Sequence, residues 1–338
     1  MYKIIDMHCD TIPTMYERKR GGEEISLQNS DLKINLEKMK KGNYLCQCFS
    51  LFTCMEELEK RKIKPFTHVW DLAHYWKEEI GRYPDKIRQI YTYQDLLENA
   101  RAGRISAVMA VEEGAVYEGK LENLYRLYDL GVRMSTITWN FVNELGYPNP
   151  PRIPGKSWNP DIEHGLTSTG IQFVEEMERL GILVDISHLN DAGIRDVFLH
   201  TKGPVIASHS NARKEAGHLR NLSDDMIRKI AERGGVIGAN FFPGFLIECE
   251  ITSQEMKKTL CASAEDVVRH MKYLKQTGGI DCVALGTDFD GFDGYMNIEH
   301  AGQMQTLADV MSKEGFSSGE IEKIFSENTM RVFREVWT

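Results

Sequence analysis

Short apolar runs rich in β-branched residues alternate with helical runs along the whole 338-residue chain. The strand-like runs are residues 3–8, 44–52, 105–112, 133–139, 182–188, 204–209, 235–242 and 282–288. Most of them are apolar on both faces, which is typical of parallel strands that are covered on both sides. Amphipathic helical repeats lie between the runs, at 122–131, 169–181, 223–235 and 262–279. This alternation predicts an α/β fold, and the eight strands favour a (β/α)8 TIM-type barrel.

The main alternative is a doubly wound open sheet, in which strands and helices also alternate. Such a sheet usually has a Gly-rich turn after its first strand, whereas here the sequence HCDTIP follows at 8–13. We therefore favour the barrel. The chain has no low-complexity stretch, no internal repeat and no Pro/Ser-rich linker, so we expect one domain over residues 1–338.

The composition limits the partners of the protein. The chain has 41 Lys and Arg against 50 Asp and Glu, and this net charge of −9 argues against nucleic acid or an anionic membrane. No apolar run reaches the ~20 residues of a membrane span, and the first residues resemble a strand rather than a signal peptide. The seven cysteines include no CxxC pair. Together these features predict reduced thiols and a cytoplasmic location.

Residue types that bind metals stand at or just after the ends of five of the runs. They are His8, Asp10, Glu112, His188, His209 and Asp288. Because the carboxyl ends of the strands of a (β/α)8 barrel converge on one site, we expect these side chains to meet there. Side chains two positions apart on a strand point the same way, so His8 and Asp10 can both face inward. Imidazole and carboxylate groups suit Zn²⁺, and this set predicts a two-metal site with one shared carboxylate.

Each of these residues alone is weak support for a metal site. A single histidine at a strand end usually makes ordinary hydrogen bonds with the backbone. Asp288 alone could simply cap the turn that follows it. Glu112 is followed by Glu113, and their chemistry does not separate the two. The prediction therefore rests on the placement of the whole set.

Several stretches resemble the membrane (renal) dipeptidase family, zinc peptidases of the amidohydrolase superfamily. They are DMHCDT, AVEEG, LVDISH, PVIASHSN, the RN of HLRNLSDD, ANFF, LGTDFDG and ENTMRVF, which run from residue 6 to residue 333. The resemblance therefore covers essentially the whole chain. It implies a barrel that binds two zinc ions, one held by His8 and Asp10 and the other by His188 and His209. Glu112 would bridge the two ions.

The resemblance also implies that Asp288 moves protons at the metal centre and that Arg220 binds the terminal carboxylate of the substrate. A guanidinium suits this task because it pairs with a carboxylate through two parallel hydrogen bonds. Without the resemblance, a surface salt bridge is the ordinary interpretation of Arg220. The implied reaction is the hydrolysis of dipeptides, with dipeptides that end in a D-residue among the candidates. The family also leads us to expect a homodimer.

The chain departs from the family at the end of the fourth predicted strand. Many relatives have a histidine there that is thought to polarise the scissile carbonyl, whereas this chain has Trp139 followed by Asn140. Trp takes up no proton and has a single N–H donor. We expect Trp139 and Asn140 to contact the substrate, with carbonyl polarisation left to the metal, to Asn140 or to a loop residue. Phe245 stands where the family has a tyrosine, and 143–160 is expected to form a loop over the site.

Two other functions stay open at this point. A different amidohydrolase, acting on acyl-amino acids or cyclic amides, usually shows HxH after the first strand, and several use a modified lysine as the bridge. This chain has HxD there and Glu112 as the candidate bridge. The other alternative is a catalytically silent barrel. Only Trp139 favours it, and the presence of all the expected metal ligands and of Asp288 argues against it.

Overall fold

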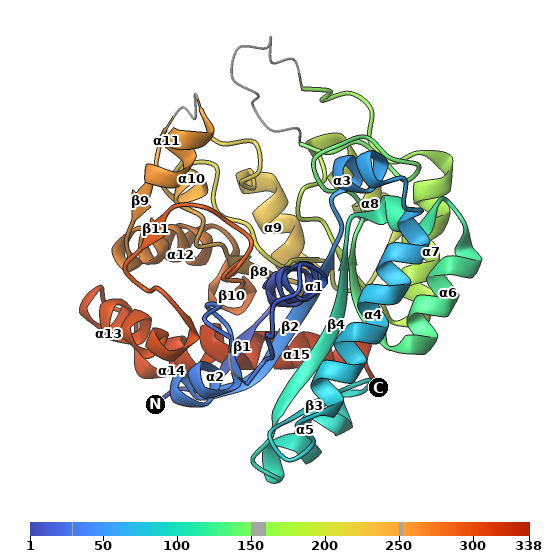
Figure 1. The fold of residues 1–338 in the computed structure, drawn as a ribbon. Helices are drawn as coiled ribbons and strands as arrows, with labels where there is room; N and C mark the ends of the chain where they lie inside the picture. The colour runs from blue at the N-terminus through green and yellow to red at the C-terminus, as the bar shows by residue number, and fades with distance from the viewer. Residues whose placement is uncertain (29, 150–159, 250–252) are drawn as a thin grey trace.

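The computed structural model describes residues 1–28, 30–149, 160–249 and 253–338. Within these residues, eight parallel strands close into a barrel, which confirms the predicted (β/α)8 fold (Figure 1). In the order in which they pair, the strands are β2 (Tyr44–Phe52), β1 (Ile4–Asp6), β10 (Val283–Leu285), β8 (Val236–Ala239), β7 (Ile206–Ala207), β6 (Leu183–Asp185), β5 (Val132–Thr136) and β4 (Ile105–Glu112). The barrel closes because β4 also pairs with β2.

Six of the eight strands are shorter than the runs that predicted them. The residues after each of these strands leave the sheet and form loops at the carboxyl end of the barrel. His8, for example, lies two residues beyond β1, and His188 lies three residues beyond β6. Trp139 was expected at the end of a strand, but β5 ends at Thr136 and Trp139 stands on the loop that follows.

The described residues also contain three strands that the sequence did not predict. β3 (Ile87–Gln89) pairs with the first residues of β4, on the outside of the closed barrel order. Only Ile87 of this strand is buried, so it has no apolar run to reveal it. β9 (Cys261–Ala262) and β11 (Tyr295–Met296) form a separate small sheet.

The helices surround the barrel (Figure 1). Among the described residues they are α1 (Thr11–Arg20), α2 (Leu36–Gly42), α3 (Met55–Arg61), α4 (Pro65–Gly81), α5 (Tyr93–Arg101), α6 (Leu121–Leu130), α7 (Ser168–Leu180), α8 (Asp191–His200), α9 (Asp224–Glu232), α10 (Pro243–Leu246), α11 (Gln254–Thr259), α12 (Ala264–Gly278), α13 (Gln305–Lys313), α14 (Ser318–Glu322) and α15 (Asn328–Val336). The four predicted helical runs contain α6, α7, α9 and α12. Gly131 and Gly181 end α6 and α7 with left-handed φ angles, as a terminal glycine favours. No helix in the described part of the chain is both long and apolar enough to span a membrane.

The barrel interior is a packed core. Side chains such as Ile5, Val108 and Ala110 fill it, and Phe333 of α15 and the following Trp337 pack against its amino end. A second apolar layer lies between the outer faces of the strands and the helices. Because the interior is filled, a ligand site has room only among the loops at the ends of the strands.

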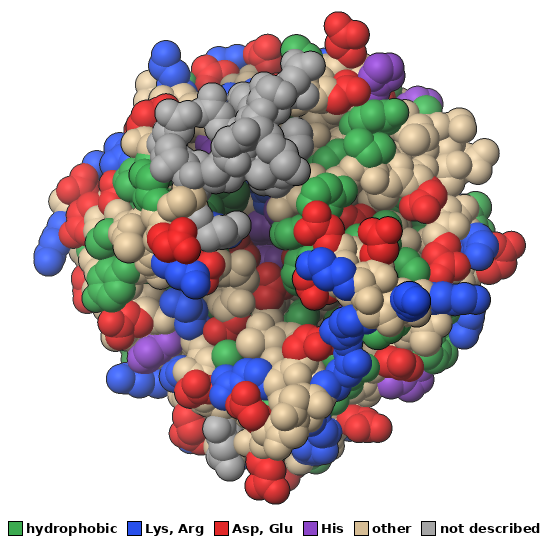
Figure 2. Space-filling view, turned by 45° about the horizontal axis from the view of Figure 1, so that its top comes forward, with side chains coloured by type: hydrophobic (Ala, Val, Ile, Leu, Met, Phe, Trp, Pro, Cys, Tyr) green, Lys and Arg blue, Asp and Glu red, His purple; other side chains and the backbone are tan. Residues whose placement is uncertain are grey.

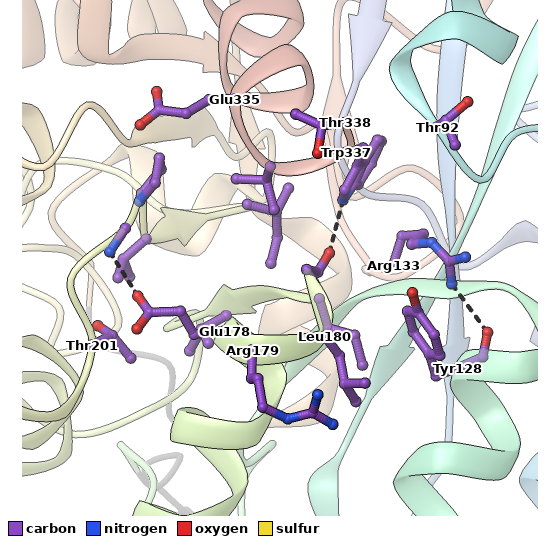
Figure 3. Close-up of a pocket in the computed structure, with 18 of the residues that line it drawn as sticks. Thr92, Tyr128, Arg133, Glu178, Arg179, Leu180, Thr201, Glu335, Trp337 and Thr338 are labelled. Carbon is purple, nitrogen blue, oxygen red and sulfur yellow. Dashed lines mark hydrogen bonds between the residues drawn. The ribbon is translucent and has the colours of Figure 1, made fainter.

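A cavity of about 490 Å³ lies at the amino ends of β5, β6 and β7 (Figure 3). On its walls, Nε1 of Trp337 donates to the carbonyl oxygen of Gly181 at 3.1 Å, and Nη1 of Arg133 donates to that of Tyr128 at 3.0 Å. These bonds fasten the residue after α15 to the end of α7, and the start of β5 to α6. Residues at this end of such a barrel usually serve stability rather than chemistry.

Candidate metal centre

Six acidic and histidine side chains meet at the carboxyl end of the barrel. They are the residues that the sequence places at strand ends, His8, Asp10, Glu112, His188, His209 and Asp288. Each is at most 9% exposed. His188 and Asp288 have left-handed φ angles of 70° and 60°, which residues other than glycine rarely adopt. Such strained backbone tends to be found at functional sites.

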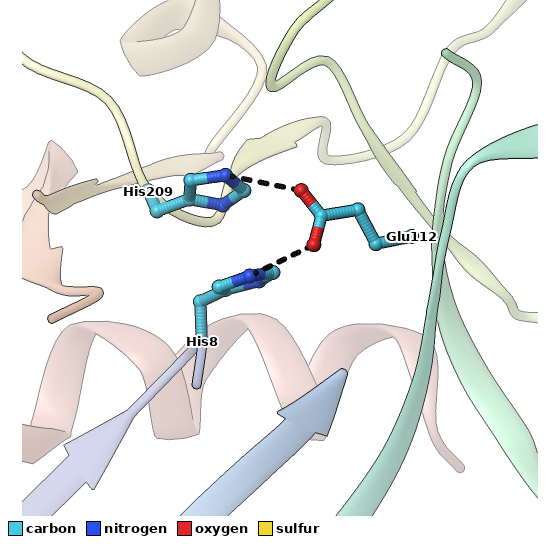
Figure 4. Close-up of side chains that lie close together, drawn as sticks. All are labelled: His8, Glu112 and His209. Atoms are coloured by element: carbon cyan, nitrogen blue, oxygen red, sulfur yellow. Dashed lines mark ion pairs between the residues drawn. The ribbon is translucent and has the colours of Figure 1, made fainter. Parts of the chain in front are cut away.

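Glu112 lies at the middle of the group and divides it into two sides (Figure 4). Its Oε2 lies 3.2 Å from Nε2 of His8. Its other oxygen, Oε1, lies 3.1 Å from Nε2 of His188 and 3.6 Å from Nε2 of His209. Ser50 on β2 donates to Oε2 at 3.2 Å and so helps to hold the carboxylate. The two oxygens of one carboxylate therefore face two different sets of side chains.

The side that contains His8 is also rich in carboxylates. Nε2 of His8 lies 3.7 Å from Oδ1 of Asp10 and 3.9 Å from Oδ1 of Asp288. Within the described residues, neither Nε2 of His8 nor Oδ1 of Asp10 has an aligned hydrogen-bond partner, although both atoms are buried. Buried polar atoms are rarely left without a partner, so these two atoms fit a missing ligand such as a metal ion.

The distances between donor atoms also fit metal binding. One atom from each of His8, Glu112 and His209 lies within 4.8 Å of the others, and the same holds for His8, Asp10 and Asp288. Both sets combine nitrogen and oxygen donors, as zinc sites do. The two sets share His8 and together contain five of the six side chains.

The electrostatics of the site favour a bound cation. Burial raises the pKa of Asp288 to about 7, and the neighbouring Asp10 and Glu112 add to this effect. Burial lowers the pKa of His8, but the carboxylates of Glu112 and Asp10 outweigh it and hold that pKa well above its usual value. In the metal-free protein a proton on His8 thus neutralises part of the negative charge of the neighbouring carboxylates, and a divalent cation could replace that proton. Burial lowers the pKa of His188 to about 3, which leaves its imidazole neutral and able to bind a metal.

A cavity of about 660 Å³ opens above these residues. Figure 2 looks onto this end of the barrel and shows the surface hollowed near its centre, with histidine and acidic side chains visible inside. Arg220 lines the cavity and is only 4% exposed, so it is not the surface residue of the ordinary interpretation. Its Nη1 donates to Oγ of Ser210 at 2.7 Å and its Nη2 to the carbonyl oxygen of His209 at 3.0 Å. Its buried Nε has no hydrogen-bond partner among the described residues.

Trp139 and Asn140 line the same cavity. The indole of Trp139 packs edge-on against Phe52, with 4.9 Å between ring centroids, and lies 6.2 Å from the ring of His188. Oδ1 of Asn140 lies 3.2 Å from Nδ1 of His188. Both residues are therefore placed to contact a ligand. Asn140 also orients the imidazole of His188, a role that sequence reasoning missed.

Comparison with known proteins identifies the family. The family model for membrane dipeptidase (peptidase family M19) matches residues 1–338. The chain belongs to this family. The match decides between the dipeptidase reaction and the other functions that the sequence left open, and the protein is a metal-dependent dipeptidase.

Individual relatives are similar to the chain over nearly their whole length. An uncharacterized protein from the pqqA 5′ region of Klebsiella pneumoniae is 30% identical over 274 residues, which are 81% of this chain and 97% of that protein. The crystal structure of dipeptidase AC, a metallopeptidase of family M19, has a TM-score of 0.88 at 26% identity and covers 99% of both chains. A metallopeptidase from Rhodobacter sphaeroides, solved with a phosphinate mimic of L-Ala-D-Ala, has a TM-score of 0.87 at 24% identity over 99% of both chains.

The structure separates Glu112 from Glu113 in this dipeptidase. The side chain of Glu113 turns away from the metal centre and accepts the backbone N–H groups of Ala115 at 2.8 Å and Trp139 at 3.1 Å. Its Oε1 also accepts a hydrogen bond from Nδ2 of Asn143 at 2.5 Å. Glu113 therefore holds the loop that carries Trp139, whereas Glu112 faces the metal centre.

Asn240 is a further residue of the dipeptidase site that sequence reasoning missed. It is completely buried, and its Nδ2 donates to Oδ2 of Asp288 at 3.0 Å. Its Oδ1 accepts the backbone N–H of Phe242 at 2.6 Å, which fixes the direction of the amide. The ANFF stretch pointed to this position without giving it a role. Of the loop expected at 143–160, residues 150–159 lie outside the described residues.

Proposed function

We propose that this dipeptidase binds two zinc ions, one on each side of Glu112. His8 and Asp10 would hold one ion, His188 and His209 the other, and Glu112 would bridge them. The observation that carries this proposal is the divided carboxylate, with Oε2 toward His8 and Oε1 toward His188 and His209. Two-metal hydrolase sites use such a shared carboxylate to keep their ions about 3.5–4 Å apart.

Zinc ions bound here would supply Lewis acidity toward a water molecule and toward the carbonyl of the scissile amide. The protein supplies the proton transfer. Oδ1 of Asp288 faces His8, and its Oδ2 is held by Nδ2 of Asn240, so this carboxylate is fixed at the edge of the centre. Asp288 would take a proton from the attacking water and give it to the leaving amine.

Arg220 would bind the terminal carboxylate of the dipeptide. Its Nε is buried and unpartnered among the described residues, and the side chain lines the cavity next to the metal centre. Trp139 and Asn140, which line the same cavity, would also contact the substrate. Dipeptides with a C-terminal D-residue are candidate substrates, and the L-Ala-D-Ala mimic held by the Rhodobacter sphaeroides relative supports this choice.

Replacing Arg220 by Lys is expected to raise KM for dipeptides about 10–100-fold with little change in kcat. An ammonium group keeps the charge but loses the fork that pairs with a carboxylate. Steady-state kinetics on a dipeptide and on its C-terminal amide would check this. The substitution should have little effect on the amide, which has no carboxylate to bind. An equal loss on both substrates would contradict the proposed contact.

Metal dependence tests the proposed function directly. Zinc-loaded protein would be assayed for amine release from a panel of L-L and L-D dipeptides, before and after treatment with a chelator. We expect two zinc ions per chain, cleavage that stops after chelation, and recovery when zinc is added back. Dipeptides with blocked C-termini should be poor substrates. Full activity with one ion per chain would contradict the two-zinc centre, and no cleavage of any dipeptide by the zinc-loaded protein would contradict the proposed reaction.

The cytoplasmic location, the single domain over residues 1–338 and the homodimer stay predictions. All seven cysteines are among the described residues, and each is a free thiol. Free thiols are usual in a reducing compartment, which supports the cytoplasmic prediction.

A further inference from the structure

Two buried carboxylates lie behind the metal centre, and the proposed mechanism uses neither of them. Asp6 is the last residue of β1 and is 0% exposed, and Asp185 is the last residue of β6 and is 3% exposed. Burying a carboxylate is costly unless hydrogen bonds satisfy it. The partners of these two residues therefore show what each one does.

Asp185 holds Ser208, which directly follows the neighbouring strand β7 and precedes the candidate metal ligand His209. Its Oδ1 accepts the backbone N–H groups of Ser187 at 3.0 Å and Ser208 at 2.9 Å. Its Oδ2 accepts the hydroxyl of Ser208 in a short hydrogen bond. Oγ of Ser208 in turn lies 2.8 Å from Nδ1 of His209. The three side chains thus form a continuous chain of hydrogen bonds behind the metal centre.

The direction of these bonds fixes the tautomer of His209. A serine hydroxyl has one hydrogen, and Ser208 gives it to Asp185, so its oxygen must accept a hydrogen from Nδ1 of His209. A neutral imidazole carries hydrogen on only one of its nitrogens. Nε2 of His209 therefore keeps its lone pair, and this nitrogen faces Glu112 Oε1 and His188 Nε2.

Asp6 makes the same arrangement on the other side of the barrel, with one difference. Its Oδ1 accepts the backbone N–H groups of Thr287 at 2.9 Å and His8 at 3.3 Å, and its Oδ2 accepts the hydroxyl of Thr287 at 2.7 Å. Thr287 precedes Asp288, as Ser208 precedes His209. However, the oxygen of Thr287 accepts the backbone N–H of Phe289 at 3.2 Å and, within the described part of the chain, bonds no imidazole. Asp6 therefore holds the backbone near Asp288 but sets no tautomer.

We propose that Asp185 and Ser208 are positioning residues that keep His209 protonated on Nδ1, so that Nε2 is free to bind metal. The inference rests on the proposed role of His209 as a metal ligand. Partners behind metal-binding histidines commonly fix the tautomer and orientation of the ring in this way. On the His188 side of the centre, the hydrogen-bonded chain Asp185–Ser208–His209 would thus keep the metal-binding nitrogen unprotonated.

Replacing Asp185 by Asn tests the proposal because the new amide can fit in only one direction. Two backbone N–H groups point at the position of Oδ1, so the amide oxygen must stand there and the NH2 group must face Ser208. Ser208 then accepts from Asn and gives its own hydrogen to Nδ1 of His209. The imidazole would have to carry its hydrogen on Nε2, which blocks metal binding.

Two measurements follow the change. Spectra of the metal-free protein with 15N-labelled histidine, at a pH where His209 is neutral, report which nitrogen is protonated. Competition with a chelator reports the affinity for zinc. In wild type we expect hydrogen on Nδ1, and in D185N we expect it on Nε2 with zinc binding about 100-fold weaker, at the upper end of what such partners contribute. An Nδ1-protonated ring with wild-type zinc affinity in D185N would overturn the proposal.

Asp6→Asn is the matched control, because it makes the same isosteric change in the arrangement that lacks an imidazole. It should leave His209 protonated on Nδ1. If D185N fails to fold, Ser208→Ala provides a second test, since it removes the hydroxyl and should give a mixture of both tautomers with roughly 10-fold weaker zinc binding. A Ser208→Ala protein with the wild-type tautomer and zinc affinity would refute the relay. None of these readouts requires dipeptide cleavage, so they remain informative if the proposed reaction is wrong.

Discussion

The Glu112→Gln protein is expected to lose at least one of the two proposed metal ions and to hydrolyse dipeptides at least about 1000-fold more slowly than wild type. Glutamine has one oxygen and one NH2 group, so it cannot offer an oxygen both to the His8 side and to the His188 and His209 side. A metal ion contributes several kcal/mol to the transition state, which corresponds to a loss of this size. Metal content per chain and kcat/KM for a cleaved dipeptide are the two measurements.

Glu113→Gln is the control for this substitution. Glu113 is the next residue and is equally buried, but it bonds the loop of Trp139 and Asn143 instead of facing the centre. Its replacement should lower thermal stability, because a glutamine NH2 group cannot accept both sets of N–H donors, while two ions stay bound. Two bound ions and near wild-type turnover in the Glu112→Gln protein would refute the bridging role.

The difference between Glu112 and Glu113 also shows why the residue pattern by itself did not separate the two, so that the family resemblance had to point to Glu112. On β4, Val108 and Ala110 face the barrel interior, and Glu112 follows them with the period of two of a strand. The outer face of the same strand, with Met109 and Val111, is equally apolar. Since both faces are buried, the pattern does not reveal which face points inward, and only the closed barrel does.

The eight barrel strands and the metal-binding residue types near their carboxyl ends could be predicted, because a parallel barrel requires apolar runs that end at one rim. The last residues of six of these strands could not be predicted, since the runs in the sequence continue past the ends of the strands. β3 could not be predicted, since a three-residue edge segment with one buried side chain has no periodicity. Asp6 and Asp185 did leave a signal. A carboxylate inside an apolar run, as in IIDMH and LVDISH, is costly to bury without hydrogen-bond partners. The sequence therefore already indicates that both residues have such partners.

The residue pattern did not reveal that Arg220 is buried. Its hydrogen-bond partners are a serine hydroxyl and a backbone carbonyl, and neither marks a buried arginine in the way that a nearby acid does. A contact with the backbone oxygen of His209 leaves no trace in the side-chain pattern. The resemblance to relatives supplied this residue, and the geometry then placed it in the cavity.

Replacing Asp288 by Asn should leave metal binding at the proposed two-ion centre unchanged and lower kcat about 100- to 10,000-fold, which is the usual contribution of a general acid–base group. The carbonyl oxygen of the new side chain can still accept from Nδ2 of Asn240, so the residue should keep its position. Its NH2 group would then face the side of His8 and Asp10, where it can donate a hydrogen bond but cannot take a proton from water. Metal content, kcat and KM would be measured together.

Asp290→Asn serves as the control, since Asp290 lies in the same loop but bonds Thr11 and the backbone N–H of Lys33. That change should reduce stability without reducing kcat. If the Asp288→Asn protein turns over dipeptides at a rate close to wild type, proton transfer must pass through another group.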